Sequence, residues 1–331
     1  MIASPSAKLP NAPAQERTGF LSIDKGSGMT SHDVVARARR LLRQKRIGHA
    51  GTLDPMATGV LVLCLGKATR LAELVSEGRK TYVTEVTFGR ETNTLDASGA
   101  TTATEKASHL TEAMVGALLD PFRGEVHQVP PMVSARHHEG QRLYTLARQG
   151  ITVEREARPI TIYRLELLAF TPGDEPRARL EVECSTGTYI RVLAQDLGIA
   201  AGCGAHMSVL RRTVVGSFRL DESVKLAEVE SLLADGRLDS RVLPAAAAVR
   251  HWPQRVLCEQ ESCAIARGEA IDAGVVEGLA DQTPVALLGH LGDLAALARL
   301  APAAEGARVL RPYKVFVSPT DTRADTEEVN P

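Results

Sequence analysis

The stretch RIGHAGTLDPMATGVLVLCLGKAT, residues 46–69, places one acidic residue, Asp54, on a glycine-punctuated loop that follows a basic segment. Residues 60–65 are an uninterrupted apolar run between glycines, which predicts a fully buried strand. Asp54 precedes Pro55, and a residue before proline favours an extended or turn conformation. A carboxylate on a loop that is anchored to a buried strand suits a catalytic group. An Asp that only starts a turn before Pro explains the same pattern, so spacing alone leaves both interpretations open.

Length and composition are those of an ordinary globular protein. The chain has 331 residues, of which 44% are hydrophobic and 24% charged, enough for two domains with their own cores. No run of 18 apolar residues occurs, so we expect no transmembrane helix and no membrane partner. Residues 1–17 are rich in Pro, Ala and Ser and lack the apolar segment of a signal peptide, which predicts a disordered tail.

The cysteines and the glycine motifs predict chemistry without a metal or a cofactor. Five scattered cysteines include no Cys-x-x-Cys pair, which argues against a zinc site or a disulfide framework and favours the reducing cytoplasm. Gly66 and Lys67 lack the other residues of a phosphate-binding loop, and the glycines near residue 27 lack the third Gly of a dinucleotide fingerprint. No pair of histidines has the spacing of a zinc protease.

The distribution of charge is more informative than the net charge of −1. Six basic residues occupy the segment that leads into the Asp54 loop: Arg37, Arg39, Arg40, Arg43, Lys45 and Arg46. Such a run is often only a solvated face, but its position beside the candidate site favours contact with phosphates. Acidic residues gather instead near the end of the chain, where residues 319–331 are predicted to form an acidic tail.

Apolar periodicity predicts strands and helices along the rest of the chain. Thr30 and Asp33 have the spacing of a capping box at the start of a helix. Strands are predicted over residues 19–24, 80–88, 158–170, 177–184 and 206–218, and further helices over residues 67–75, 110–119, 140–150 and 223–233 and after residue 189. Residues 243–253 are Ala-rich and end near the only Trp, which predicts a domain boundary there.

The segment GHAGTLDPMATGVLVLCLGKATRL, residues 48–71, resembles the signature of the TruB family of tRNA pseudouridine synthases. Further resembling segments follow in the same order between residues 19 and 220, and RPYKVF at residues 311–316 resembles the family's C-terminal domain. Gly26 stands where the family has Pro, which loosens a turn by backbone entropy without changing its chemistry. Arg136 stands where the family has Lys, and because the two differ in hydrogen-bond geometry we assign it no specific role.

The resemblance implies an α+β fold with two domains. A pseudouridine synthase catalytic domain with a mixed, mainly antiparallel sheet is expected over residues 18–247. A small β-rich, PUA-like RNA-binding domain is expected over residues 250–318. The two domains lie between the predicted tails.

The resemblance also implies a reaction and its central residue. The family isomerises uridine to pseudouridine in the T-loop of tRNA, at position 55, by breaking the C1′–N1 bond, rotating the uracil and joining C5 to C1′. The Asp of its signature is catalytic, which points to Asp54 as nucleophile or as stabiliser of positive charge on the sugar. Arg191 of GTYIR matches the family cation that keeps this Asp charged. Without the resemblance, an ordinary exposed arginine at a helix start is the favoured interpretation of Arg191.

Four further residues match substrate-binding positions of the family. A uridine in folded RNA must leave its stack, so the pocket needs an aromatic face, and Tyr82 matches that position. Tyr189 and Leu210 match other pocket positions, and His49 matches the residue that fills the space left by the flipped base. Each has a plainer explanation: packing across strands for Tyr82, core positions for Tyr189 and Leu210, and a glycine-rich loop for His49.

Two other classes of function remain open from the residues alone. A non-catalytic protein that binds or folds tRNA shares the basic segment and the C-terminal domain. A hydrolase with paired carboxylates, as in glycosidases, is weaker because no second acid lies near Asp54 in sequence. We expect a cytoplasmic monomer whose partner is the T-arm of tRNA.

Overall fold

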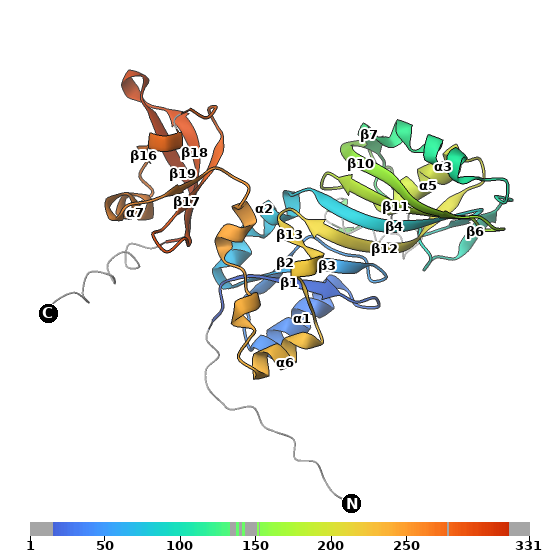
Figure 1. Ribbon diagram of the computed structural model, residues 1–331, viewed down its shortest axis with the longest axis horizontal. Coiled ribbons are helices and arrows are strands. Elements are labelled where there is room, and N and C mark those ends of the chain that lie inside the picture. Colours follow the sequence, from blue (N-terminus) through green and yellow to red (C-terminus); the bar gives the residue numbers. More distant parts are fainter. Residues whose placement is uncertain are drawn as a thin grey trace, which may run out of the picture.

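The structure, a computed structural model, describes residues 16–132, 137–138, 141–142, 151, 153–276 and 278–317. It contains a ten-stranded mixed sheet with helices packed on it and a separate five-stranded sheet formed by the C-terminal part of the chain (Figure 1). The predicted α+β class, with a mixed sheet and a small β-rich C-terminal domain, is confirmed.

The large sheet has the strand order β14-β1-β3-β12-β4-β11-β10-β7, with β13 beside β12 and β2 beside β3. Its strands are β1 (Gly19–Lys25), β2 (Ile47–Ala50), β3 (Thr58–Leu65), β4 (Lys80–Phe88), β7 (Gly124–Gln128), β10 (Arg158–Thr171), β11 (Arg177–Cys184), β12 (Ala205–Val215), β13 (Phe218–Arg219) and β14 (Val224–Lys225). The pairs β1–β14 and β3–β12 are parallel, and the other pairs of this sheet are antiparallel. The expectation of a mainly antiparallel sheet therefore holds.

Strand β3 is buried on both faces, which explains its unbroken apolar sequence. Leu61 and Leu63 pack on one face in a core shared with helices α1 (Ser31–Leu42), α3 (Glu112–Leu118), α5 (Ile190–Ala200) and α6 (Glu228–Ala234). Val60 and Val62 pack on the other face against α2 (Ala72–Glu77) and the short 3-10 helices Gly66–Leu71 and Ala245–Val249. The strand that carries the Asp54 loop is thus fixed from both sides.

Helix α1 begins with the predicted capping box. The Thr30 hydroxyl accepts a hydrogen bond from the Asp33 backbone N–H at 3.1 Å, and the Asp33 carboxylate accepts one from the Thr30 N–H at 2.9 Å. Two backbone donors that a helix start leaves unpaired are satisfied in this way.

Several predicted helices differ from the structure. Residues 67–75 begin as the 3-10 helix Gly66–Leu71 and become α-helical only in α2. The helix predicted over residues 223–233 is shorter, because β14 pairs with β1 first and α6 starts at Glu228. The helix predicted over residues 140–150 is wrong at Gln141–Arg142, which form β9 and pair with β8 (His137–His138). Residues 143–150 and Arg136 lie outside the described residues, as do most of the predicted tails.

The C-terminal sheet has the order β15-β17-β18-β19-β16. Its elements are β15 (Gln254–Val256), α7 (Glu259–Ala266), β16 (Ile271–Asp272), β17 (Pro284–Leu288), β18 (Leu294–Pro302) and β19 (Arg308–Val315). This sheet has its own core, whereas Leu288 and Leu294 pack in the core that contains Val60 and Val62 of β3. The Arg70 guanidinium donates to the Val315 carbonyl at 2.8 Å, and the Lys314 ammonium donates to the Arg70 carbonyl at 2.9 Å. The two sheets are therefore joined by apolar and polar contacts.

At Gly59 strands β3 and β12 approach too closely for a side chain, because a Cβ there would lie 2.1 Å from the Arg212 carbonyl oxygen. Its φ of +99° also favours glycine. We expect Gly59→Ala to lower the free energy of unfolding by about 3 kcal/mol or more, measured by urea denaturation. The matched control is Gly26→Ala, where a Cβ meets nothing within 4 Å, and we expect a change within about 0.5 kcal/mol. Equal midpoints for the two variants would contradict the close approach.

Candidate active site

A cavity of about 240 Å³ lies between the Asp54 loop, strands β4 and β12, and the residues that lead into α5. Five of the residues singled out from the sequence line it: Asp54, Tyr82, Tyr189, Arg191 and Leu210. They come from segments far apart in the chain, which the large sheet brings together.

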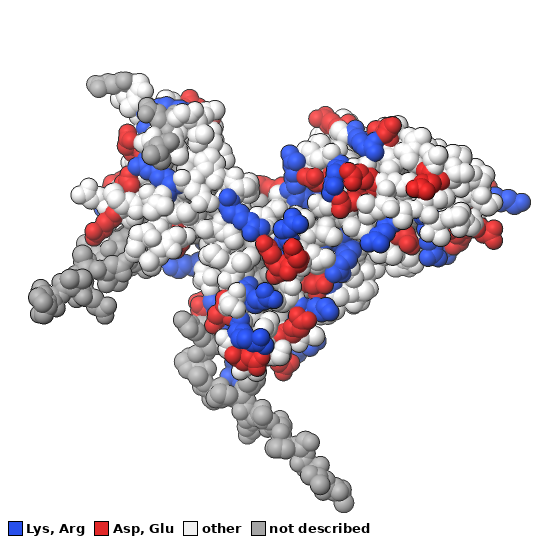
Figure 2. Space-filling model, viewed as in Figure 1, with Lys and Arg blue, Asp and Glu red and all other residues white. Residues whose placement is uncertain are grey.

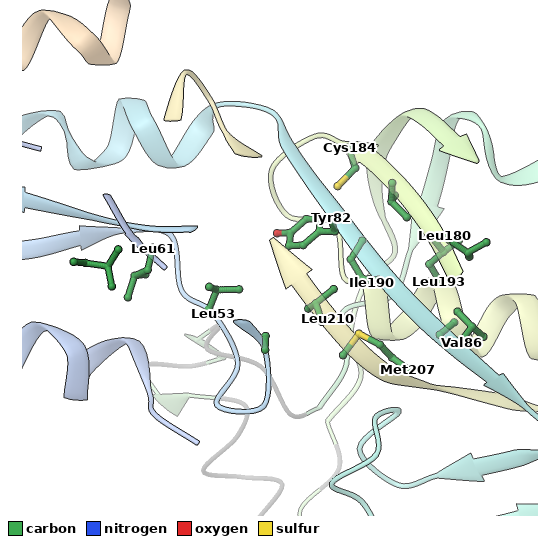
Figure 3. Close-up of a cluster of buried hydrophobic side chains, with 14 of the residues drawn as sticks. Leu53, Leu61, Tyr82, Val86, Leu180, Cys184, Ile190, Leu193, Met207 and Leu210 are labelled. Carbon is green, nitrogen blue, oxygen red and sulfur yellow. The ribbon is translucent and has the colours of Figure 1, made fainter. Parts of the chain in front are cut away.

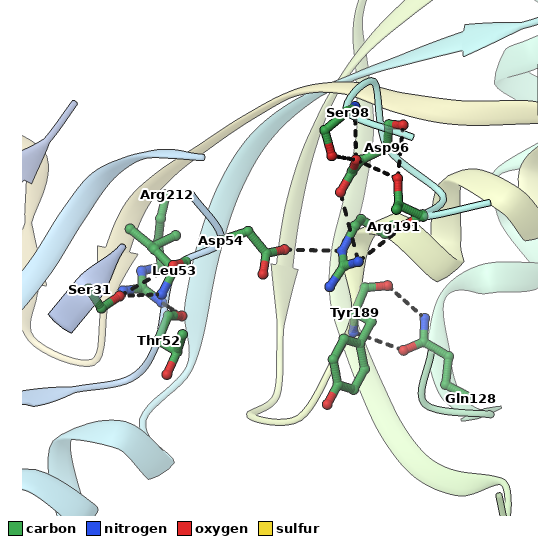
Figure 4. Close-up of polar contacts among 11 residues, drawn as sticks. Ser31, Thr52, Leu53, Asp54, Asp96, Ser98, Gln128, Tyr189, Arg191 and Arg212 are labelled. Atoms are coloured by element: carbon green, nitrogen blue, oxygen red, sulfur yellow. Dashed lines mark hydrogen bonds and ion pairs between the residues drawn. The ribbon is translucent and has the colours of Figure 1, made fainter. Parts of the chain in front are cut away.

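The acidic group of the cavity is paired with a buried cation. Arg191 Nε lies 3.0 Å from Asp54 Oδ2 (Figure 4). The Asp54 side chain is 36% exposed, whereas the Arg191 side chain is 5% exposed. The buried guanidinium therefore orients the carboxylate, while the carboxylate stays accessible to a molecule in the cavity.

Arg191 is itself held by a second acid, Asp96, which sequence reasoning did not single out. Arg191 Nη1 donates to the Thr94 carbonyl at 3.1 Å and lies 3.8 Å from Asp96 Oδ2. The buried Asp96 carboxylate accepts hydrogen bonds from the Ser98 backbone N–H and from the hydroxyls of Thr94 and Ser98 (Figure 4). The polar turn of residues 94–98 thus fixes the guanidinium in one orientation.

The loop before Asp54 is held by Arg212, another residue that sequence reasoning missed. This residue is 1% exposed, and its guanidinium donates to the carbonyls of Gly51, Thr52 and Val60 at 3.0, 3.2 and 2.8 Å. On the other side, the Leu53 backbone N–H donates to the Ser31 hydroxyl at 2.9 Å. The only signal in the sequence is the two-residue spacing from Leu210, which places both side chains on one face of a strand.

Tyr82 provides the aromatic wall of the cavity. Its ring packs with Ile190 and Leu210 in an apolar patch (Figure 3). Burial raises the pKa of the Tyr82 phenol, and the positive charge of the Arg212 guanidinium opposes that rise. At neutral pH the group is therefore a neutral phenol, with an apolar ring that a flat base can stack on.

Tyr189 is placed by its backbone at the start of α5. Its N–H donates to the Gln128 side-chain oxygen at 2.9 Å, and the Gln128 amide donates back to the Tyr189 carbonyl at 3.2 Å. This pair of bonds fixes the chain two residues before Arg191. Gln128 comes from β7, which sequence reasoning did not connect with the site.

His49 lies on β2 and does not line the cavity described above. Its ring meets His32 of α1 edge-on, with ring centroids 5.5 Å apart. Burial, and then the neighbouring His32, lower the pKa of His49. The structure therefore places His49 on the α1 side of the Asp54 loop.

The six basic residues of the segment 37–46 are all exposed. Two of them also support the fold: Arg39 donates to the Ile47 carbonyl, and Arg46 donates to the Thr69 hydroxyl. Figure 2 shows basic and acidic side chains interspersed over the visible face, with no single continuous basic surface. On this face, contact with an acidic partner would therefore depend on local groups of arginines.

The described residues lack two further features, a metal site and a membrane-spanning helix. They contain no group of three or more His, Cys, Asp or Glu side chains placed to hold a metal ion. No helix among them is both long and apolar enough to cross a membrane.

Family models match most of the chain. The model described as "TruB family pseudouridylate synthase (N terminal domain)" matches residues 39–190, and "tRNA pseudouridylate synthase B C-terminal domain" matches residues 191–250. A relative from Symbiobacterium thermophilum, named tRNA pseudouridine synthase B, is 47% identical over 264 residues, 80% of this chain and 86% of the relative. One of the same name from Dehalococcoides mccartyi is 42% identical over 299 residues, 90% of this chain and 96% of the relative.

Solved structures match the fold over a similar span. "Crystal Structure of a Cbf5-Nop10-Gar1 Complex" has a TM-score of 0.71 at 27% identity and covers 92% of this chain and 87% of that chain. "Structure of H/ACA RNP bound to a substrate RNA containing 2'-deoxyuridine" has a TM-score of 0.70 at 25% identity, covering 91% of this chain and 86% of that chain.

These matches assign the chain to the pseudouridine synthases, enzymes that isomerise uridine within RNA. Within this class of enzymes, both family models and the relatives point to one family. The chain belongs to the TruB family.

Proposed function

We propose that this protein isomerises uridine to pseudouridine in tRNA, at position 55 of the T-loop. The observation that supports the proposal most is the Asp54 carboxylate, open to the cavity and held 3.0 Å from a buried guanidinium. The relatives named above carry the name of that activity. The position in tRNA rests on the resemblance of residues 48–71 to the family signature.

The target uridine reaches the cavity by leaving the base stack. Chemistry at C1′ and C5 requires access to atoms that are shielded in folded RNA. Tyr82 and Leu210 offer apolar surface on which the everted uracil can pack, and Tyr189 lies at the start of α5 beside the same cavity. In this proposal, binding of the base repays part of the cost of unstacking.

Asp54 then acts on the sugar. Its carboxylate either bonds to C1′ or stabilises the positive charge that develops there as the C1′–N1 bond breaks. The uracil rotates, C5 bonds to C1′, the C5 proton is lost and N1 gains a proton. Substrate and product have the same composition, so no oxidant or reductant is consumed.

The rest of the tRNA arm is held by shape and by phosphate contacts. The exposed arginines of α1 and of the segment that follows it are close in sequence to the Asp54 loop and can contact phosphates. We also propose that the protein acts as a monomer in the cytoplasm, a reducing compartment that suits its five scattered cysteines.

The direct test is incubation of the purified protein with an unmodified tRNA transcript, followed by mapping of pseudouridine. We expect one pseudouridine per molecule, at position 55, and none in a transcript with cytidine at that position. Binding of the transcript without any product would favour the non-catalytic tRNA-binding alternative. Product at another position would refute the assignment of the T-loop.

A further inference from the structure

Three polar side chains that the reaction above does not use converge at one end of the cavity. A Cβ built on Gly51 would lie 3.6 Å from Arg212 Nη1, 3.8 Å from the Ser76 hydroxyl and 3.9 Å from Lys80 Cε. Gly51 has a φ of +91°, so glycine suits this position and keeps the space open. All four residues line the same cavity as Asp54.

Lys80 is the least explained of these groups. The residue is 6% exposed, and its ammonium donates to the carbonyls of Ser76 and Gly78 at 2.6 and 2.9 Å, at the end of α2. An ammonium has three N–H donors, so one remains without an acceptor among the described residues. Lys80 and Tyr82 are two residues apart on β4, so both side chains lie on the face that forms the cavity.

This end of the cavity carries positive charge. Within the described part of the chain, neither Lys80 nor Arg212 forms an ion pair with a carboxylate, and Arg212 is compensated by carbonyl oxygens. A buried cation without a partner anion is costly, and it favours an anion or a strongly polarised oxygen that enters the same space.

We propose that Lys80 is a further catalytic residue, which donates its third N–H to a carbonyl oxygen of the target uracil. The inference rests on the proposed function. When the C1′–N1 bond breaks, its electron pair stays on the uracil and the negative charge spreads to O2 and O4. An ammonium in contact with either oxygen stabilises this charge while the base rotates, as the donors of an oxyanion hole do. The Lys80 proton is not transferred, and the charge disperses when C5 bonds to C1′.

The ammonium must be protonated to act in this way. Burial, and then the Arg212 guanidinium, lower the pKa of Lys80 to about 8, while Cys184 of β11 acts in the opposite direction. Burial raises the pKa of Cys184 to about 11, so that thiol is neutral in the range of interest. Tyr82 on the same strand is a neutral phenol there, and Asp54 lines the cavity as well. We therefore expect kcat/KM to fall as the pH rises through about 8.

The test compares pH profiles of single-turnover and steady-state rates on an unmodified tRNA transcript. For Lys80→Met we expect a loss of about 10²-fold or more in the single-turnover rate at pH 7, with tRNA affinity changed less than about threefold. For Lys80→Arg we expect part of the rate to return and the fall near pH 8 to disappear, because guanidinium stays protonated there. Lys225→Met, at the exposed edge strand β14, is the matched control and should behave as wild type.

Three results would overturn the inference. The first is a wild-type kcat/KM that does not fall near pH 8. The second is a Lys80→Arg variant with the wild-type alkaline fall. The third is a Lys80→Met variant that loses only tRNA affinity, which would make Lys80 a phosphate contact. If Lys80→Met does not fold, the first two results still decide whether Lys80 acts as proposed. A wild-type protein that forms no pseudouridine refutes the proposed function instead.

Discussion

Replacing Asp54 by Asn is expected to lower the rate of pseudouridine formation by about 10⁴-fold or more while tRNA binding persists. The amide has nearly the same shape as the carboxylate but carries no charge and is a poor nucleophile. It can neither bond to C1′ nor balance positive charge on the sugar. The single-turnover rate at saturating enzyme isolates the chemical step, and a filter-binding measurement reports the affinity.

The matched control for this substitution is Asp221→Asn. Asp221 is exposed, pairs with Arg219 at 3.6 Å and does not line the cavity. We expect its rate to equal that of the wild type. An Asp54→Asn variant with more than about a tenth of the wild-type rate would remove Asp54 from the reaction.

Arg191→Met is expected to have the second largest effect, because it acts on both catalysis and folding. Without the guanidinium, Asp54 loses the partner that orients it, and the buried Asp96 loses its cation. We expect a rate lower by about 10³-fold. The free energy of unfolding should fall by about 3 kcal/mol, at the low end for a buried pair because Asp54 is partly hydrated.

Arg191→Lys separates charge from geometry. A lysine keeps the charge but cannot contact Asp54 and the Thr94 carbonyl with two fixed nitrogens, so we expect partial recovery of stability and little recovery of rate. The control is Arg164→Met, since Arg164 is an exposed arginine paired with Glu181 and Glu166 away from the cavity. Unfolding in urea and single-turnover rates measure both effects. Full activity in Arg191→Lys would show that a positive charge beside Asp54 is sufficient for catalysis and that the guanidinium geometry is not required.

Much of the fold could be predicted from local patterns. The apolar run of β3, the capping box of α1 and the alternating residues of β4 are set by neighbours in sequence. The helix predicted over residues 223–233 was partly wrong because its first residues pair with β1, some 200 residues earlier in the chain. Local propensity carries no information about this long-range strand pairing.

The candidate site was predictable only where residues match a known motif. Asp54 and Arg191 match motif positions of the family, and the structure brings them to one cavity. Lys80, Asp96 and Arg212 were not assigned to the site from the sequence, because a polar residue on a strand or loop is usually exposed. Arg211 and Arg212 are adjacent, yet Arg212 is fully buried whereas Arg211 is partly exposed and pairs with Asp24. Only the strand pairing of β12 with β3 and β4 decides which arginine faces inward.

A map of pseudouridines in tRNA from cells that lack this gene tests the central claim most directly. The cells are compared after the wild-type gene or the Asp54→Asn gene is restored. We predict unmodified uridine at position 55 in the deletion strain, pseudouridine there with the wild-type gene, and none with Asp54→Asn. Pseudouridine at position 55 in the deletion strain, or its return with Asp54→Asn, would contradict the account.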